Sequence, residues 1–497
     1  MRPLLRLTAL LLMAVTPNLC AEESALDTAF LNALVNDIKS SAALPSGTAV
    51  AVVHNDRIIY QDHFGYLDIE NRVAADANSR FYIASVTKPF VALNYLLDAN
   101  TDSGLETVTL STMFPELALP DREDLTAKAL LTHTASINNF PLVLATAYSG
   151  VHSPASLARL VTEYSAPSSE AVGEFKYTNV GYNIYSVYAD SAFKRPWQDK
   201  LQQQVFAPAG MQATTARRSD IGDQALVAKP YSLMNPQRQT ALYLEKGDNT
   251  LHAAGGVFST AADMGRFLIA QLNEGMIDGK QVYPAEVIAR SHRQQAVTDR
   301  AYLDFTRDGY AWGWYTGDYK AQRMLHHFGG FAGTHAHLSF IPAQKIGLVV
   351  LNSEDFLSAR LTNLIADYVY GSLLGEADIE QRVTQRADEL KQKLAGLDGQ
   401  MAKQRQKING REWRLSLPQQ HYVGEYRHPQ LGSIFVRHNE EQRFDVEWGV
   451  MHSSSTGMNE ADKIRVELEP TSGTVITFNV DDQVQSLEYG GVVFNKL

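Results

Sequence analysis

The sequence is nearly devoid of cysteine. Cys20 is the only one among 497 residues, and it stands in an N-terminal segment that we expect to be removed on export. The mature chain would then carry no thiol. This excludes disulfides, thiolate metal sites and cysteine nucleophiles, and it is compatible with an oxidising compartment.

Positive charge is also scarce. The formal net charge is −11 at pH 7, and no block of Lys and Arg is dense enough to reverse it locally. Such a surface repels a phosphate backbone, so we expect no nucleic-acid partner. Beyond residue 21 no apolar run is long enough to span a bilayer, so we expect no transmembrane segment in the mature protein.

The N-terminal segment has the pattern of an export signal. Arg2 and Arg6 precede the apolar run at residues 7–15, and Ala21 offers a cleavage site ahead of two acidic residues. We therefore expect a signal peptide at residues 1–21 and a periplasmic or secreted product. Lipid attachment at Cys20 is the less favoured alternative, because the residues before it are not the small ones expected of a lipid-modified cysteine.

Hydrophobic periodicity outlines a first, large domain. A helix is expected near residues 26–38, then hairpin strands at 48–54 and 57–64, then a mainly helical stretch to about residue 320. Strands return at 336–341 and 346–352, before a helix at 361–374. Strands at both ends with helices between them indicate one sheet closed by the two ends of the domain and covered by helices, in a mixed α and β fold.

The composition changes after Gly375. Residues 376–410 are dominated by charged and amide side chains with a sparse apolar stripe, which is typical of a solvated connecting helix. Beyond Gly410, short alternating segments at 433–437, 444–448, 464–468 and 475–478 indicate strands. We therefore expect a small all-β domain at residues 411–497.

The candidate chemistry begins at Ser85 and Lys88. Three residues apart on a helix, the two side chains share one face. Pro89 is tolerated only near a helix start, so Ser85 should lie at a helix N-terminus, where unpaired amides favour a developing anion. A neutral or proton-sharing Lys88 could accept the serine proton, which activates the hydroxyl without a histidine.

Chance matches to this spacing are expected, about one or two in a chain of this length. A second one, Ser191 with Lys194, stands at the end of an expected helix, where Lys complements the helix C-terminus. We reject it as a site. The alternative for Ser85 itself is a helix N-cap beside a surface lysine.

Order along the chain supports the first interpretation, because Tyr177 and Asn179 follow about ninety residues later. A tyrosine close to an ammonium loses its proton more easily than a free phenol and can relay protons between the serine and a leaving group. Asn179 can hold a substrate amide through its carbonyl and its NH2 group. The alternative is that Tyr177 belongs to an aromatic core.

A third element, His327 with Gly329, comes before an expected strand, where glycine lets a substrate backbone approach. The same short pattern at His63 ends the early hairpin and precedes the serine, so we expect only a strand terminus there. A metal site at His326, His327, His335 and His337 is the alternative. It is disfavoured because no Asp or Glu stands at ligand spacing and alternate strand residues face opposite ways.

Taken in order, Ser85-x-x-Lys88, Tyr177-x-Asn179 and His327-x-Gly329 resemble the motifs of the superfamily of serine β-lactamases, low-molecular-mass penicillin-binding proteins and related esterases. The stretches at 130–134 and 254–263 also resemble family segments, and the similarity covers about residues 45 to 355. It implies a β-lactamase-like hydrolase domain, here residues 22–375, with an antiparallel sheet flanked by helices, a mainly helical half, and the site in a cleft between them.

The resemblance also implies a mechanism. Ser85 would attack a carbonyl, Lys88 and Tyr177 would move the proton, and water would later release the acyl group. Asn179, His327 and Gly329 would bind substrate, and the backbone amides of Ser85 and Gly330 would form the oxyanion hole. No metal or cofactor is required. The expected partner is a small-molecule or cell-wall peptide substrate.

Two positions depart from the family pattern. Ala135-Ser136 replaces the usual Ser-Gly, so a loop that needs positive φ would carry a serine. His327 stands where the best-known β-lactamases have Lys, and resembles carboxypeptidases, D-aminopeptidases and esterases instead. With a usual pKa of about 6.5 its side chain would be largely neutral at alkaline pH and offer one donor to a substrate carboxylate. We therefore expect ester or D-amino-acid amide hydrolysis to exceed penicillin hydrolysis.

Several functions stay open at this point. The substrate is a β-lactam, a D-alanyl peptide, a D-amino-acid amide or an ester, and the oligomeric state is not indicated. A penicillin-binding sensor with little turnover and a noncatalytic cell-wall-binding protein are the other classes. An α/β-hydrolase is disfavoured, because no Gly-x-Ser-x-Gly segment occurs.

Overall fold

The computed structural model describes residues 26–117, 119, 122–222 and 226–497. The expected signal peptide, with Cys20, lies outside these residues. Within them, no helix combines the length and the apolar character needed to cross a membrane.

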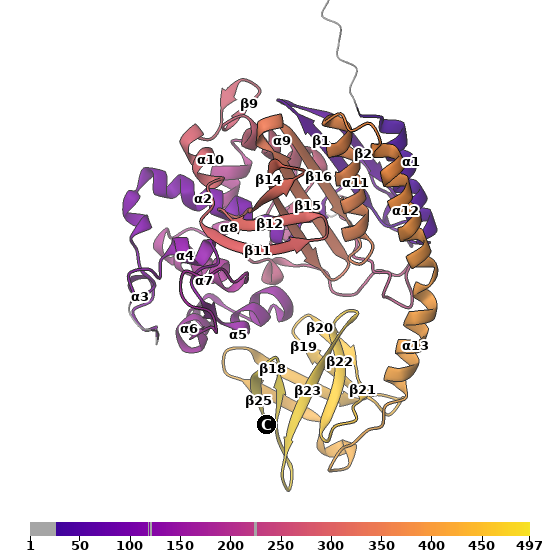
Figure 1. The fold of residues 1–497 in the computed structure, drawn as a ribbon. Helices are drawn as coiled ribbons and strands as arrows, with labels where there is room; N and C mark the ends of the chain where they lie inside the picture. Colours follow the sequence, from indigo (N-terminus) through magenta and orange to yellow (C-terminus); the bar gives the residue numbers. More distant parts are fainter. Residues whose placement is uncertain (1–25, 118, 120–121, 223–225) are drawn as a thin grey trace, which may run out of the picture.

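The centre of the larger domain is an antiparallel sheet that joins segments far apart in the sequence (Figure 1). Strand β1 pairs on one side with β2 and on the other with β16, about three hundred residues later, which confirms the expected sheet closed by the two ends of the domain. Among the described residues the order across this sheet is β11 (Ala296–Tyr302), β12 (Phe305–Tyr310), β13 (Tyr315–Tyr319), β14 (Gln322–Phe331), β15 (Thr334–Ile341), β16 (Ile346–Asn352), β1 (Thr48–His54) and β2 (Arg57–Phe64).

Both faces of the sheet are buried around its central strands, β15, β16 and β1. In β1, Ala49, Ala51 and Val53 belong to one hydrophobic core, while Val50 and Val52 belong to another. This follows from the alternation of side chains along a strand and explains why β1 is apolar throughout. One face is covered by α9 (Ala261–Leu272), and the other by α1 (Thr28–Ser41), α11 (Ser358–Leu373) and α12 (Ile379–Ala395).

The prediction of a mainly helical stretch to about residue 320 was wrong over residues 296–319, which form β11, β12 and β13, and β14 was not predicted. These strands carry charged residues such as Asp299, Arg300 and Arg323 on exposed positions, so their apolar alternation is weak. Their pairing depends on non-local partners that a local pattern does not contain.

The helical half lies beside the sheet (Figure 1). Its helices bury the core residues Leu96, Leu131 and Tyr182. They are α2 (Lys88–Thr101), α3 (Leu110–Met113), α4 (Ala127–Leu131), α5 (Phe140–Val143), the π-helix η3 (Leu144–Ser149), α6 (Pro154–Tyr164), α7 (Val180–Ala192), α8 (Trp197–Leu201) and α10 (Ala285–Ser291).

The charged segment after Gly375 forms two helices, α12 and α13 (Leu397–Asn409), and not the single solvated helix expected. Val383 and Leu390 of α12 are buried against the large domain. An all-β unit follows, as expected from the sequence. Its strands are β17 (Gly424–His428), β18 (Gly432–His438), β19 (Phe444–Trp448), β20 (Met451–Ser454), β21 (Thr456–Gly457), β22 (Lys463–Glu469), β23 (Ser472–Val480), β24 (Val484–Tyr489) and β25 (Val492–Lys496).

Candidate active site

Ser85 lies in a tight turn directly before a helix. The turn, η1, spans Ala84–Thr87, and α2 begins at Lys88 with Pro89 in its first turn. Ala84 has φ +45°, a conformation that costs a non-glycine residue roughly 1 kcal/mol or more. Ser85 is half-buried in a buried segment, so its hydroxyl is held at a helix N-terminus and reachable, as expected.

Lys88 has three polar partners and is fully buried. Its Nζ lies 3.0 Å from Ser85 Oγ, 2.8 Å from Asn179 Oδ1 and 2.7 Å from the carbonyl oxygen of Ala254. Burial holds the pKa of Lys88 well below its usual value, because none of the carboxylates in the described part of the chain compensates for the lost solvation. A neutral amine has two N–H groups and one lone pair. Asn179 Oδ1 and the Ala254 carbonyl accept the two hydrogens, and the lone pair is left for Ser85.

Tyr177 packs against the same lysine. Lys88 Nζ lies 4.8 Å from the centre of the Tyr177 ring, and the Tyr177 hydroxyl forms a hydrogen bond with Ser85. Burial raises the pKa of Tyr177 above its usual value. This contradicts the expectation that Tyr177 loses its proton easily, since the neighbouring lysine is itself inclined to be neutral. Tyr177 is therefore a phenol at neutral pH.

Gly329 and Gly330 bring β14 against the serine turn. A Cβ on Gly329 would lie 2.1 Å from the carbonyl oxygen of Ile83 and 3.0 Å from the amide nitrogen of Ser85. Gly330 is exposed, and a Cβ there would meet nothing within 4 Å. The motif precedes the expected strand, which is β15, and itself lies inside β14, so the backbone of a strand forms one edge of the site.

His327 is buried and its ring nitrogens are both engaged. Nδ1 lies 2.8 Å from the carbonyl oxygen of Phe328, and Nε2 lies 3.4 Å from the Tyr310 hydroxyl. The carbonyl can only accept, so we assign the proton to Nδ1. Burial, with smaller contributions from Lys88 and Arg307, holds the pKa of His327 well below its usual value. The expected N–H donor to a substrate carboxylate is therefore already taken.

The rejected motifs lie elsewhere. Ser191 and Lys194 are exposed near the end of α7, and His63 pairs with Ala49 inside the early hairpin. Three other histidines, His326, His335 and His337, are buried among aromatic rings. Among the residues that the structure describes, no three His, Cys, Asp or Glu side chains are placed to hold a metal ion.

Two residues that the sequence did not single out complete the surroundings. The His133 ring lies 4.6 Å from the Tyr177 ring, and its Nδ1 accepts the backbone N–H of Thr178 at 3.4 Å. The Arg307 guanidinium lies 3.7 Å from the centre of the Tyr315 ring. His133 could have been found in the stretch at 130–134, whereas Arg307 lies in a strand that no sequence pattern predicted.

The comparisons place this geometry among known proteins. A sequence model of the family described as Beta-lactamase matches residues 39–367. The chain is 26% identical over 206 residues to the D-aminopeptidase of Brucella anthropi, covering 41% of this chain and 38% of that protein. It is 21% identical over 334 residues to the unguisins hydrolase ungD of Aspergillus violaceofuscus, covering 63% of this chain and 59% of that protein.

The chain thus spans less than two thirds of the length of either relative. A solved structure, the octameric penicillin-binding protein homologue from Pyrococcus abyssi, shares the fold with a TM-score of 0.60 at 18% identity. That match covers 95% of this chain and 100% of the other.

Proposed function

Because the chain belongs to the Beta-lactamase family, we propose that it is a serine hydrolase that forms an acyl-enzyme at Ser85. The observation that carries this proposal is the contact set of Lys88, whose Nζ lies 3.0 Å from Ser85 Oγ, 2.8 Å from Asn179 Oδ1 and 2.7 Å from the carbonyl oxygen of Ala254. In the neutral amine, the last two oxygens accept the N–H groups and the lone pair can receive the Ser85 proton. A base in hydrogen-bond reach of the hydroxyl is what a serine nucleophile requires.

Acylation then proceeds in balanced steps. The Ser85 proton passes to Lys88 Nζ as Oγ bonds to the substrate carbonyl carbon. The amides of Ser85 and Gly330 stabilise the oxygen that becomes negative. Tyr177 gives its proton to the departing oxygen or nitrogen as the bond to the carbonyl carbon breaks, and the phenolate regains a proton from the Lys88 ammonium.

Deacylation reverses the roles. A water molecule loses one proton to the neutral Lys88 and Tyr177 pair as its oxygen bonds to the acyl carbon, and Ser85 Oγ leaves with a proton. The Asn179 NH2 group, whose companion Oδ1 is occupied by Lys88, is free to bind a substrate carbonyl. Gly329 lets the substrate lie close to β14.

We propose esters and D-amino-acid amides as substrates ahead of penicillins. The reason is the state of His327, which is neutral and already donates to Phe328, so it does not supply the cation that a penicillin carboxylate would use. The D-aminopeptidase among the relatives agrees with amide hydrolysis, and the unguisins hydrolase agrees with hydrolysis in general. A cell-wall peptide is a substrate of the same chemical class.

We further propose a location for the protein and a division of its chain into domains. The product would be periplasmic or secreted after removal of residues 1–21, and the chain would divide into a hydrolase domain at 22–375, a linker at 376–410 and a β domain at 411–497. A sensor that is acylated without turnover, and a noncatalytic cell-wall-binding protein, are the competing functions.

Covalent labelling separates these functions. A fluorophosphonate should label the mature protein at Ser85, Ser85→Ala should abolish both labelling and ester turnover, and Ser191→Ala should change neither, because Ser191 is exposed and lacks a buried base. Labelling that survives in Ser85→Ala would disprove the assignment. Labelling of Ser85 by a penicillin without recovery of free protein would favour the sensor.

A further inference from the structure

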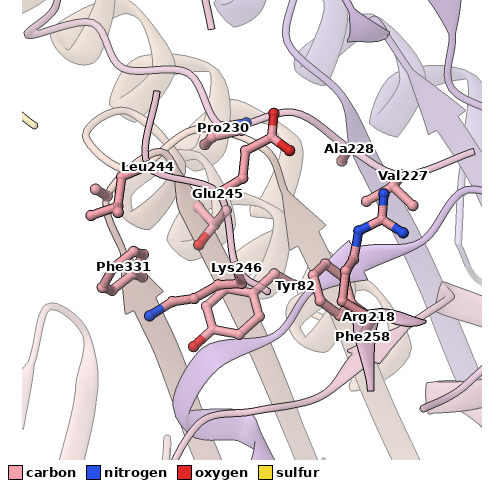
Figure 2. Close-up of a pocket in the computed structure, with 12 residues that line it drawn as sticks. Tyr82, Arg218, Val227, Ala228, Pro230, Leu244, Glu245, Lys246, Phe258 and Phe331 are labelled. Atoms are coloured by element: carbon pink, nitrogen blue, oxygen red, sulfur yellow. The ribbon is translucent and has the colours of Figure 1, made fainter. Parts of the chain in front are cut away.

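A small pocket lies at the end of β14, where Phe331 is one of the residues that line it (Figure 2). Tyr82, three residues before Ser85, and Phe331, two residues after Gly329, both line it. Phe258 and Leu244 add apolar walls, and Lys246 lies between the Tyr82 and Phe331 rings in the close-up. Two walls of the pocket therefore come from the segments that also carry Ser85 and Gly329.

The direction of β14 decides which part of a substrate reaches this pocket. Tyr177, the proposed proton donor to the leaving group, lies next to His327, with their ring centres 5.9 Å apart. Gly329 touches the serine turn, and Phe331 lies beyond it along the strand. The leaving group therefore departs on the His327 side, and the acyl group extends the opposite way, toward the pocket.

Lys246 gives this pocket a cation. It is buried, its Nζ lies 3.4 Å from the centre of the Phe331 ring, and it donates a hydrogen bond to the carbonyl oxygen of Ala147 in η3. An ammonium has three N–H groups. The described part of the chain offers Lys246 no other hydrogen-bond acceptor and no carboxylate at ion-pair distance, so two donors remain for a ligand.

We propose that this pocket is the acyl-side subsite of the enzyme and that it selects acyl groups with an apolar body and an anionic end, bound by Lys246. This inference rests on the proposed acyl-enzyme function. Aromatic walls suit the apolar body, and a charge-assisted hydrogen bond between the lysine and a carboxylate is shorter and stronger than a neutral one.

The C-terminal domain takes part in this subsite through Glu469 at the end of β22. The Tyr243 hydroxyl donates to the carbonyl oxygen of Leu468, and the Val450 N–H donates to the carbonyl oxygen of Ser149. These contacts hold β20 and β22 against the segments that carry Lys246 and η3, on the side of the β domain that faces the hydrolase (Figure 1). Glu469 acts on Lys246 through space, so it favours the charged lysine without occupying its donors.

The charge of Lys246 is set by a few named groups. Burial lowers its pKa to about 7, and Glu469 opposes this shift. The Tyr82 and Tyr148 rings also face it, and His252, whose pKa burial holds well below its usual value, is neutral. Glu245 and Arg218 are on the pocket rim. The lysine is therefore charged below about pH 7 and loses its charge above it.

Paired substrates test this subsite. The p-nitrophenyl monoester of adipic acid and its methyl ester differ only in the charge at the far end of the acyl group. We expect kcat/KM to favour the charged ester by about tenfold or more at pH 6, with the preference declining as pH rises through about 7. Hydrolysis by Ser85→Ala gives the background.

Four variants test whether Lys246 causes the preference for the charged ester. Lys246→Met should remove the preference, so that the kcat/KM values for the charged ester and the methyl ester differ by less than about twofold, and Lys246→Arg should retain the preference at pH 8. Glu469→Gln should move the midpoint of the decline to lower pH, because the charged lysine loses its support. Lys280→Met, which removes an exposed lysine of the distant β10 (Lys280–Gln281), is the control for net charge.

Binding separates this inference from the proposed function. Calorimetry measures the affinities of Ser85→Ala for the monoanilide of adipic acid and for the methyl ester of that anilide. The same two affinities are then measured for the double variant that also carries Lys246→Met. Two results would overturn the subsite whether or not the protein turns over esters. The first is equal affinity for the charged and the uncharged anilide both with and without the Lys246→Met substitution. The second is a preference for the charged ester that survives Lys246→Met. Absence of labelling at Ser85 would overturn the hydrolase proposal alone.

Discussion

The carbonyl oxygen of Ile83 lies 2.1 Å from the position that a Cβ on Gly329 would occupy. Real Cβ atoms do not approach an oxygen so closely, so Gly329→Ala must push β14 and the serine turn apart. Since a displacement of about 1 Å costs roughly a hundredfold in rate, we expect kcat/KM for esters to fall at least that much. Gly399→Ala, in open space on α13, should leave activity unchanged. Normal activity in Gly329→Ala would show that the contact does not hold the site.

Tyr177→Phe isolates the phenolic proton. The ring would still pack beside Lys88 and His133, so the fold should remain intact. Loss of a general acid commonly costs two to four powers of ten, so we expect kcat to fall by roughly a hundredfold or more. The drop should be smaller for esters with a good leaving group, which need less protonation. An equal rate for wild type and variant would reduce Tyr177 to a core aromatic residue.

Lys88→Met should separate activity from stability. We expect turnover to vanish, because the proposed base is removed. The folded-state pKa of Lys88 is held below its unfolded value by burial, so the unfolded chain binds more protons and the wild-type stability rises with pH between the two values. Lys88→Met lacks this dependence. Its melting temperature relative to wild type should therefore decrease as pH rises from 6 to 9, as measured by calorimetric scans.

If the difference in melting temperature between Lys88→Met and the wild type were the same at every pH from 6 to 9, the assignment of a neutral buried amine would be contradicted. Lys200→Met is the comparison, because Lys200 is also buried but forms an ion pair with Asp98. Breaking that pair leaves a buried carboxylate, so this variant should be destabilised at all of these pH values.

The backbone strain at Ser136, which stands where the family pattern has a glycine, can be tested by substitution. Ser136 has φ +51°, as the sequence suggested, and its hydroxyl contacts Ser168 Oγ at 2.8 Å and the carbonyl of Glu170. Ser136→Ala loses these hydrogen bonds and keeps the strain, whereas Ser136→Gly relieves the strain. We expect Gly to be about 1 kcal/mol more stable than Ala here. Denaturant titration of both variants measures the difference, and equal stabilities would show that the backbone is not strained.

The sequence predicted the structure correctly where the pattern is local or where motifs follow one another in a fixed order along the chain. The spacing of Ser85 and Lys88 predicted a shared helix face, and the segments rich in Val and Ile at 48–54 and 57–64 predicted β1 and β2 with the bounds observed. It was insufficient where partners are distant. Nothing near Ala254 or Asn179 shows that both bind one lysine, and the polar strands β11 to β13 are defined by pairing and not by their own pattern.

The same distinction between local and distant signals explains why the pKa of His327 in the structure differs from the value expected from the sequence. From the sequence its pKa could only be given its usual value of about 6.5. The structure adds burial, the neighbouring Lys88 and Arg307 side chains, and the engagement of Nδ1 by the Phe328 carbonyl. These depend on packing between strands that are separated in the chain. His327 therefore does not lose a charge near pH 6.5 in the folded protein, and the pH dependence expected from the sequence does not apply.

The final prediction concerns that pH dependence. With a folded-state pKa well below the usual value, His327 stays neutral at every higher pH, and Arg307 stays charged throughout. Neither group changes charge between pH 6 and 9. The ratio of kcat/KM for a substrate with a carboxylate on its leaving group to that of the matched methyl ester should therefore be constant within about twofold over this range. A histidine with an ordinary pKa that binds the carboxylate would make the ratio fall steadily with pH.

Substitutions identify which group sets that ratio. His327→Lys adds a cation beside the leaving group, so the ratio should rise, although packing of the longer chain can lower both rates. His63→Lys adds the same charge on the distant β2 and should leave the ratio unchanged. Arg307→Met should lower the ratio equally at all pH values, because a permanent charge is removed. A wild-type ratio that declines with a midpoint near 6.5 would show that the imidazole titrates in the folded protein, and that His327 contacts the substrate as an ion.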